Sequence, residues 1–295
     1  MMKKQAILIQ CHNKPEQINV LIDTFPEEQF DFYVHVDKKS DIQKDIFKKS
    51  NVHFAESRVD VRWGRYAQVE ATLVLMRMIH NPTQYSYCHL ISGNDFPVKP
   101  IDWFNSLFCE ENCREYIETK RLPGTSTWSW SGLDRMYCYY PNWMIQRPAN
   151  KFMKAVRVAY REFVMRTGIL KRKDLAVEDF YCGSSWWSIT GKMISWMLEY
   201  IDDNPRFIKC FDHGVCVDEV FFSTLAMSSP YKENIEDNHM RYMNWSEPGN
   251  NSGGPAILKR KDIDKLISSE FAFARKFTDL DTIIELKNKM ELKSI

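Results

Sequence analysis

The segment that decides the fold is residues 6–37, AILIQCHNKPEQINVLIDTFPEEQFDFYVHVD. Its two apolar runs, at 6–12 and 30–36, predict two strands. Between them Pro15 suits the first turn of a helix, which EQINVLIDTF then continues. A strand, a helix and a second strand in succession favour parallel pairing in an α/β fold.

The same alternation continues along the chain. VHFAE at 52–56 predicts a short third strand, and residues 65–81 have the apolar spacing of a helix that ends at Asn81-Pro82. YSYCHLIS at 85–92 predicts a buried central strand. Repeats, low-complexity tracts and linkers are absent from the sequence, so we expect one domain spanning residues 1–295, with a mostly parallel central sheet flanked by helices.

Composition narrows the function classes. Forty Lys and Arg against 39 Asp and Glu give a net charge of +1, without the basic excess of a dedicated nucleic-acid binder. The eight cysteines are scattered, which favours free thiols in a reducing compartment. The sequence contains neither a secretory signal nor an apolar run of the about 20 residues that a membrane span needs. Trp residues beside hydroxyls and amides, as in TWSWSGL and SSWWSIT, suit either a sugar ligand or a core.

The strand ends are where a ligand is expected, because open α/β sheets bind ligands at the carboxyl ends of their strands. His12, Asp37 and Asp95 follow three of the predicted strands. Asp37 suits a nucleotide contact or, alternatively, a turn cap. Asp95 is a single carboxylate in SGND, and the Asp-x-Asp strings at 262–264 and 279–281 lie in segments expected to face solvent. We therefore expect no metal ion, with a metal site at Asp95 as the alternative.

Residues 151–173 form a basic segment. Lys151, Lys154, Arg157 and Arg161 recur at helical spacing, with an apolar stripe (Phe152, Val156, Ala159, Phe163) on the other side. Two interpretations are open: a solvated helix face, or contact with an anionic membrane surface or a phosphate-bearing acceptor.

The stretch VDEVFF at 217–222 places two carboxylates before an apolar run. Neighbouring helical residues point about 100° apart, so normally only one of the two carboxylates can face a cleft. Asp218 is the natural N-cap, and Glu219 is then free to reach a substrate. The alternative is that both acids only cap the helix.

Seven short motifs, in this order, resemble glycosyltransferase family 14, the core-2/I-branching β-1,6-N-acetylglucosaminyltransferase and peptide O-xylosyltransferase family. They are HVDKKS, RWGRYAQVEATLVLM, HLISGNDFPVK, GSSWWSIT, VDEVFFSTL, RYMNW and FARKF. The resemblance covers residues 6–277 and implies a GT-A (Rossmann-like) fold. It divides the domain into a nucleotide-binding half at about 1–120 and an acceptor and catalytic half at about 121–295.

The resemblance also implies roles for individual residues. Glu219 is similar to the family's catalytic base, and Lys276, with Arg275 beside it, to the diphosphate contact. The residues implied to contact the nucleotide-sugar are His12, Asp37, Arg62, Trp63, Gly64, Asp95, Arg275 and Lys276. Those implied for the substrate are Trp186, Trp187, Asp218 and Trp245, with one of the two adjacent Trp residues expected in the core. A second phosphate ligand stays open between Gly253-Gly254-Pro255 and Lys259 or Arg260.

The implied function is an inverting, metal-independent transfer of a sugar, N-acetylglucosamine or xylose, from a UDP-sugar to a hydroxyl group of a glycan or lipid-linked glycan. We expect a bacterial-type enzyme of surface polysaccharide synthesis, cytoplasmic or at the inner face of the membrane, with no cofactor and no nucleic-acid partner. The alternatives are a noncatalytic carbohydrate- or nucleotide-binding protein and a metal-dependent glycosyltransferase. The sequence leaves the donor sugar, the acceptor, the linkage and the oligomeric state open.

Overall fold

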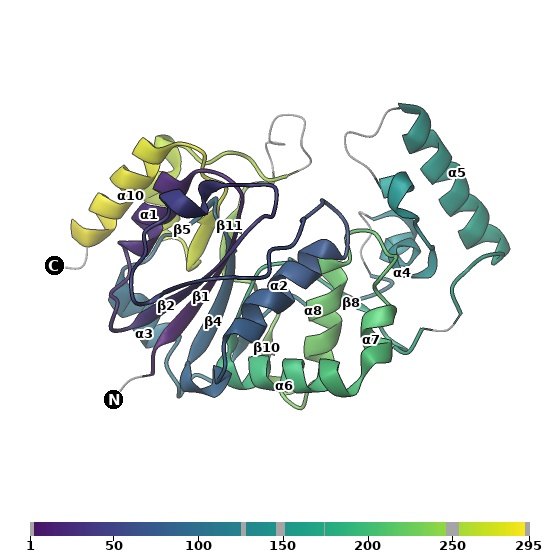
Figure 1. Cartoon of the computed structure of the whole chain (residues 1–295), viewed down its shortest axis with the longest axis horizontal. Coiled ribbons are helices and arrows are strands. Elements are labelled where there is room, and N and C mark those ends of the chain that lie inside the picture. The colour runs from purple at the N-terminus through teal and green to yellow at the C-terminus, as the bar shows by residue number, and fades with distance from the viewer. Residues whose placement is uncertain (1–2, 125–127, 146–150, 174, 246–253, 293–295) are drawn as a thin grey trace.

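The computed structural model describes residues 3–124, 128–145, 151–173, 175–245 and 254–292. Its main sheet has the strand order β10-β6-β9-β4-β1-β2-β3, and Figure 1 shows β2, β1 and β4 side by side. These strands are β1 (Gln5–Cys11), β2 (Phe30–Val36), β3 (Val52–Phe54), β4 (Tyr87–Ser92), β6 (Glu115–Tyr116), β9 (Trp187–Thr190) and β10 (Ile235–Glu236). The adjacent strands β4, β1, β2 and β3 are parallel, while β9 pairs antiparallel with β4 and β6. The expected α/β fold with a mostly parallel sheet is confirmed.

Two smaller sheets extend the structure. One has the order β11-β12-β5, from β11 (Arg241–Met243), β12 (Phe273–Arg275) and β5 (Asp95–Pro97). The other pairs β7 (Lys120–Arg121) with β8 (Tyr181–Cys182). Strand β12 carries Arg275 to the same edge of the molecule as the ends of β1 and β4, because it runs antiparallel to β5, which begins three residues after β4.

Helices cover both faces of the main sheet, and α4 and α5 lie beside these layers. The helices are α1 (Pro15–Ile22), α2 (Ala67–Met78), α3 (Ile101–Leu107), α4 (Asp134–Tyr137), α5 (Lys151–Thr167), α6 (Gly191–Asp203), α7 (Pro205–Lys209), α8 (Asp218–Met227), α9 (Ile263–Ser268) and α10 (Leu280–Leu292). Short 3-10 helices lie at Ile42–Asp45, Pro82–Gln84, Ser129–Gly132, Asn142–Ile145, Lys232–Asn234 and Arg260–Asp262.

The two cores follow from the pleat of β1, whose successive side chains point to opposite faces. Ile7 and Ile9 pack with α1, α3, α9 and α10, whereas Ala6 and Leu8 pack with α2, α6, α7 and α8. A strand buried on both faces has a continuous apolar run. The strand predicted from AILI is confirmed as β1, and the central strand predicted from YSYCHLIS is confirmed as β4. Helix α5 belongs to neither layer: its buried Val164 packs in a third, smaller cluster with residues 138–145.

Candidate active site

A pocket of about 530 Å³ lies at the carboxyl ends of β1, β2 and β4. We call it the strand-end pocket. Its lining includes His12 after β1, Asp37 after β2, Asn94 after β4 and the cations Arg275 and Lys276. Parallel strands end at one edge of a sheet, which brings together loops far apart in sequence.

A second pocket of about 470 Å³, which we call the α8 pocket, adjoins the first. It is lined by Asp218 and Glu219 of α8 and by Trp128 and Trp245. The residues that line both pockets are Trp63, Gln68, Trp186, Pro255 and Arg275. Because they share these walls, the two pockets form one continuous cleft.

Contacts around Asp37 fix one wall of the strand-end pocket. The Asp37 carboxylate accepts hydrogen bonds from the backbone N–H of Lys39 at 2.9 Å and from its ammonium group at 3.0 Å. The nearby His35 accepts the Val59 N–H at Nε2, 2.9 Å away, and burial lowers its pKa. A neutral His35 with its acceptor nitrogen engaged acts as a brace for this loop.

The opposite wall carries a fixed cation. The guanidinium of Arg275 lies 4.3 Å from the ring centroid of Trp186, and its Nε lies 3.5 Å from a carboxylate oxygen of the buried Asp95. Within the described residues, Nε and Nη1 of Arg275 are buried without a hydrogen-bond partner. Buried donors without a partner are costly, so an anion that accepts from them would be stabilised here.

A buried arginine supports this wall from behind. Arg241 of β11 donates to the carbonyl groups of Leu90 and Trp187, at 3.0 and 2.6 Å, and to the hydroxyl of Ser188 at 2.8 Å. Burial lowers its pKa to about 9. These bonds tie the β11-β12-β5 sheet to β4 and β9 and so fix the position of β12, which holds Arg275.

In the α8 pocket, the base candidate is held by an ion pair. Nη1 of Arg135, from α4, donates to Oε2 of Glu219, whose side chain remains 37% exposed. The guanidinium carbon of Arg135 also lies 3.4 Å from the ring centroid of Trp128. One carboxylate oxygen is thereby fixed, and the other has access to the pocket.

The predicted capping role of Asp218 is wrong. Val217 occupies the N-cap position, and the Asp218 side chain caps no backbone N–H. It is buried and accepts a hydrogen bond from the Ser185 hydroxyl at 2.6 Å. Burial, with a contribution from Glu219, raises the pKa of Asp218.

Comparison with known families decides the classification. The family model described as "Branch: Core-2/I-Branching enzyme" matches residues 7–267. This chain belongs to the Core-2/I-branching enzyme family. The matched span includes every element that lines the cleft except the segment from Phe273 to Lys276.

This Core-2/I-branching family member is similar to curated xylosyltransferases. It is 22% identical to xylosyltransferase sqv-6 of Caenorhabditis elegans, over 95% of this chain and 36% of that protein. It is 22% identical to human xylosyltransferase 1 over 73% of this chain and 21% of that protein. The chain therefore spans about a third or less of the length of these relatives. Among solved structures, apo mouse xyloside xylosyltransferase 1 matches at a TM-score of 0.37 and 10% identity, covering 94% of this chain and 99% of that one.

Several residues that the resemblance singled out lie away from the cleft of this family member. Trp187 is fully buried in β9, so the lining residue of the adjacent pair is Trp186. Asp95 is buried behind Arg275. Arg62 pairs with Asp60 in a neighbouring pocket, and Gly64 adopts a positive φ of 70° against the backbone of Cys216. Trp187 is thus the core member expected of the Trp pair, while Asp95, Arg62 and Gly64 do not line the two pockets as the resemblance implied.

Of the candidates for a second phosphate contact, some line the strand-end pocket and others do not. Gly254 and Pro255 line the strand-end pocket, whereas Gly253 lies outside the described residues. Lys259 and Arg260 do not line either pocket, and Arg260 pairs with Asp281 and Glu285.

Sequence reasoning missed several lining residues, among them Gln68, Glu118 and His239, and also Arg135, which contacts Glu219. Glu118 accepts the Ser184 N–H at 2.9 Å, and burial raises its pKa. The signal for it was an acid within the mixed run EYIETKR, just before β7. Arg135 lies in a region without helical or strand periodicity, and no pattern in the sequence there indicates a contact with Glu219.

Neither a cluster of metal ligands nor a membrane-spanning helix is found in the part of the chain that the structure describes. It contains no group of three or more His, Cys, Asp or Glu side chains placed to hold a metal ion. None of the helices in the same ranges is long and apolar enough to cross a membrane. All eight cysteines are free.

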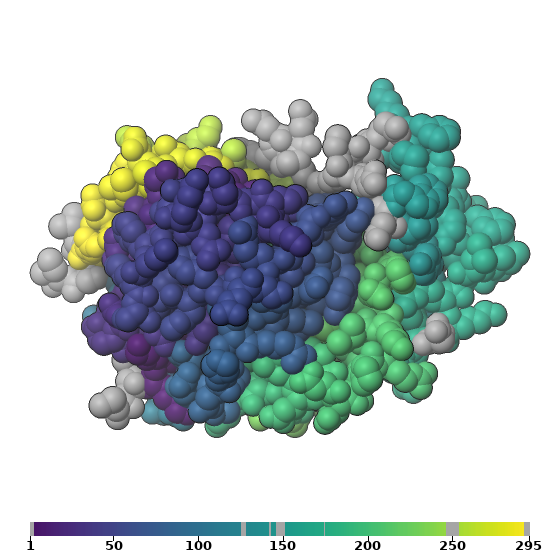
Figure 2. Space-filling view, in the orientation of Figure 1, coloured from purple at the N-terminus to yellow at the C-terminus, as the bar shows by residue number. Residues whose placement is uncertain are grey.

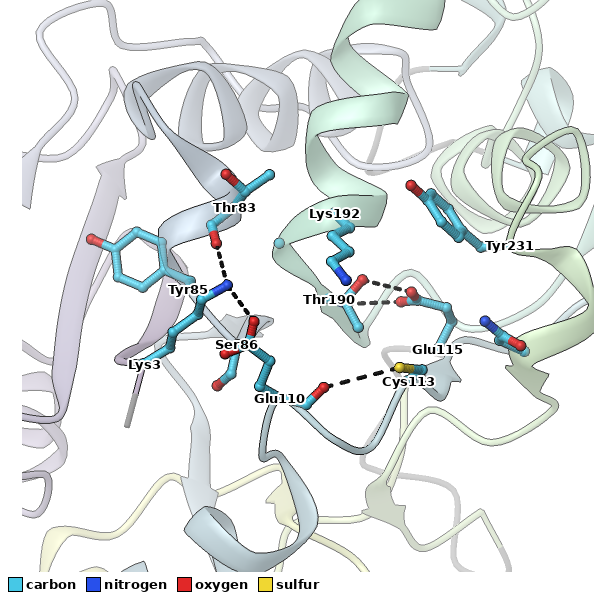
Figure 3. Close-up of a pocket in the computed structure, with 12 residues that line it drawn as sticks. Lys3, Thr83, Tyr85, Ser86, Glu110, Cys113, Glu115, Thr190, Lys192 and Tyr231 are labelled. Carbon is cyan, nitrogen blue, oxygen red and sulfur yellow. Dashed lines mark hydrogen bonds and ion pairs between the residues drawn. The ribbon is translucent and has the colours of Figure 1, made fainter. Parts of the chain in front are cut away.

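A separate small pocket of about 90 Å³ lies at the opposite edge of the sheet, beside the start of β4 (Figure 3). Its buried carboxylate, Glu115, accepts the Thr190 N–H at 2.8 Å and the Thr190 hydroxyl at 2.6 Å, and burial raises its pKa to about 7. Thr190 in turn caps α6 by accepting the Met193 N–H. Both oxygens of Glu115 are thus engaged in holding the start of a helix.

Proposed function

We propose that this chain is an inverting, metal-independent glycosyltransferase. It moves a sugar, N-acetylglucosamine or xylose, from a UDP-sugar to a hydroxyl group of a glycan acceptor in surface polysaccharide synthesis. The observation that carries the proposal is the continuity of the cleft. A pocket with two cations, Arg275 and Lys276, opens directly into one with the carboxylate of Glu219.

Each half of the cleft suits one substrate. In the strand-end pocket, His12 and Asp37 would contact the nucleoside, and Arg275 with Lys276 would neutralise the diphosphate. An inverting displacement then needs a single carboxylate on the acceptor side, to take the proton of the attacking hydroxyl as the UDP leaves. Glu219 takes this role, while Trp186 and Trp245 offer ring faces to sugars.

The metal-dependent alternative has less support. Both oxygens of Asp95 are engaged: one accepts the Ser92 N–H at 3.0 Å, and the other accepts the Ser92 hydroxyl at 2.7 Å and contacts Arg275. A noncatalytic binding protein would need the cations and aromatic walls but not the carboxylate of Glu219. The glycosyltransferase hypothesis and the binding-protein hypothesis therefore predict different effects of removing this carboxylate.

The deciding experiment measures UDP release from UDP-N-acetylglucosamine and UDP-xylose with a panel of glycan acceptors. Glu219→Gln should lower turnover by about a hundredfold or more, the usual size of a general-base effect, without weakening UDP binding. Glu233→Gln, which changes an exposed carboxylate outside the cleft, is the matched control. UDP binding with turnover that Glu219→Gln leaves intact would remove Glu219 from the role, and donor binding without any turnover would favour the noncatalytic alternative.

A further inference from the structure

Helix α5 exposes two phenylalanines of its apolar stripe. The sequence left a solvated helix face and a contact surface open, and in the structure Phe152 is 72% exposed and Phe163 is 47% exposed. The inward face uses Val164, with Tyr160 and Met165 partly buried around it. Phe152 and Phe163 lie eleven residues apart, which places them on one face of the helix, and large apolar side chains exposed on one face mark an interaction surface.

The apolar surface continues beyond the helix. Ile169 is 56% exposed and Leu170 is 67% exposed, in the turn that follows α5. Figure 1 shows α5 at the end of the molecule opposite α1 and α10, and Figure 2 shows the same segment in teal at that end. The surface is therefore free of the two sheet-covering layers and accessible to a partner.

The charge of this segment is strongly one-sided. Residues 151–173 contain eight Lys or Arg and one acid, a net charge of +7, whereas the whole chain carries +1 and the remainder therefore −6. The single acid, Glu162, is engaged by Arg161, Arg166 and Trp130. Within the described residues, Lys151, Lys154 and Arg157 form no ion pair.

We propose that residues 151–173 dock on the surface of an anionic lipid bilayer. Phe152, Phe163, Ile169 and Leu170 would enter the boundary between headgroups and acyl chains, and the flanking lysines would contact anionic headgroups. A second copy of this chain fits poorly because two surfaces of +7 repel each other. The opposite charge of the remainder would also orient the molecule, with α5 toward the membrane and the other end away from it.

Docking at α5 is linked to the cleft by direct contacts. Arg161 donates to the Ser129 hydroxyl at 2.8 Å, and Trp130 donates to Glu162 at 3.0 Å. The segment they hold contains Trp128, which lines the α8 pocket. If the proposed function holds, docking would keep the acceptor side of the cleft near the membrane, where a lipid-linked acceptor is found.

The test is sedimentation of the full chain with vesicles, a readout independent of catalysis. Vesicles of phosphatidylcholine alone are compared with vesicles in which part of the lipid is phosphatidylglycerol. We expect binding only to the anionic vesicles, and weaker binding as salt is added. Lys151→Ala and Lys154→Ala should each weaken it about fivefold, and Phe152→Ser with Phe163→Ser about tenfold or more.

Matched controls lie at the other end of the molecule. Phe47→Ser with Ile284→Ser changes two similarly exposed apolar residues, and Lys44→Ala with Lys48→Ala removes two exposed charges. These variants should bind as the wild type does, and thermal unfolding checks that every variant is folded. Equal binding to neutral vesicles would overturn the proposal, and so would equal losses of binding in the control variants. A chain that does not bind vesicles, but associates with itself or captures an acidic protein through α5, would also overturn it.

Discussion

Arg135 donates a hydrogen bond to the Glu219 carboxylate, although 84 positions separate the two residues in the chain. Its guanidinium stacks on Trp128, so it approaches the carboxylate from a fixed direction. We interpret Arg135 as a positioning residue that aims the base.

Replacing Arg135 should therefore lower turnover. Without the guanidinium the Glu219 carboxylate loses its fixed direction, so Arg135→Met should lower kcat by about tenfold and leave the Kd for UDP unchanged. Arg135→Lys keeps a donor and should retain part of the turnover. An equal loss of UDP affinity and of turnover would indicate a purely structural role, and Arg166→Met on exposed α5 serves as the control.

Arg275 should govern the affinity for the diphosphate. Charge-assisted hydrogen bonds are worth about 1.5–3 kcal/mol, so Arg275→Gln should raise the Kd for UDP by about tenfold to a hundredfold. Affinity for uridine, which lacks the phosphates, should change little. Calorimetry with both ligands separates the two effects, and Arg260→Gln, outside the cleft, is the control. Equal loss for uridine and UDP would mean that the substitution has disturbed the pocket as a whole.

The contribution of Asp218 to the free energy of unfolding should fall as the pH rises. Burial raises its folded pKa, so its favourable contribution is present below the unfolded pKa, about 3.9, and is lost as pH rises through the higher folded value. Asp218→Asn should consequently gain in Tm relative to the wild type between pH 4 and pH 8. Thermal unfolding across this range tests it, with Glu233→Gln as an exposed control. A difference in Tm that is independent of pH would contradict the assignment.

Local patterns predicted the parts of the fold that depend on neighbouring residues. The apolar run of β1, Pro15 at the start of α1 and the Asn81-Pro82 boundary after α2 each act within a few positions. The strand ends then located the strand-end pocket, because parallel strands end at one edge. The insertion of antiparallel β9 between β4 and β6 was not predictable, since its pairing joins segments about 100 and 70 residues apart.

Three features that local patterns did not predict share a physical cause. The spacing of α5 identified an apolar stripe but not which side of the helix meets the protein, and that is set by Val164 and the 138–145 segment. Asp218 was expected to cap, but Ser185 of a distant segment takes its carboxylate. The Arg135 and Glu219 pair likewise exists only after folding. In each case a long-range contact outweighs a local preference.

Turnover should be unaffected by chelation. In the described residues no cluster of three potential ligand side chains is placed to hold a metal ion, and Ser92 with Arg275 engages both oxygens of Asp95. The charge of the leaving diphosphate would instead be offset by Arg275 and Lys276. UDP release should thus be equal in EDTA and in added Mn²⁺ or Mg²⁺. Asp95→Asn should lower Tm, because Arg275 loses its buried partner, without creating a metal requirement. Activity abolished by EDTA and restored by Mn²⁺ would contradict this mechanism and favour the metal-dependent one.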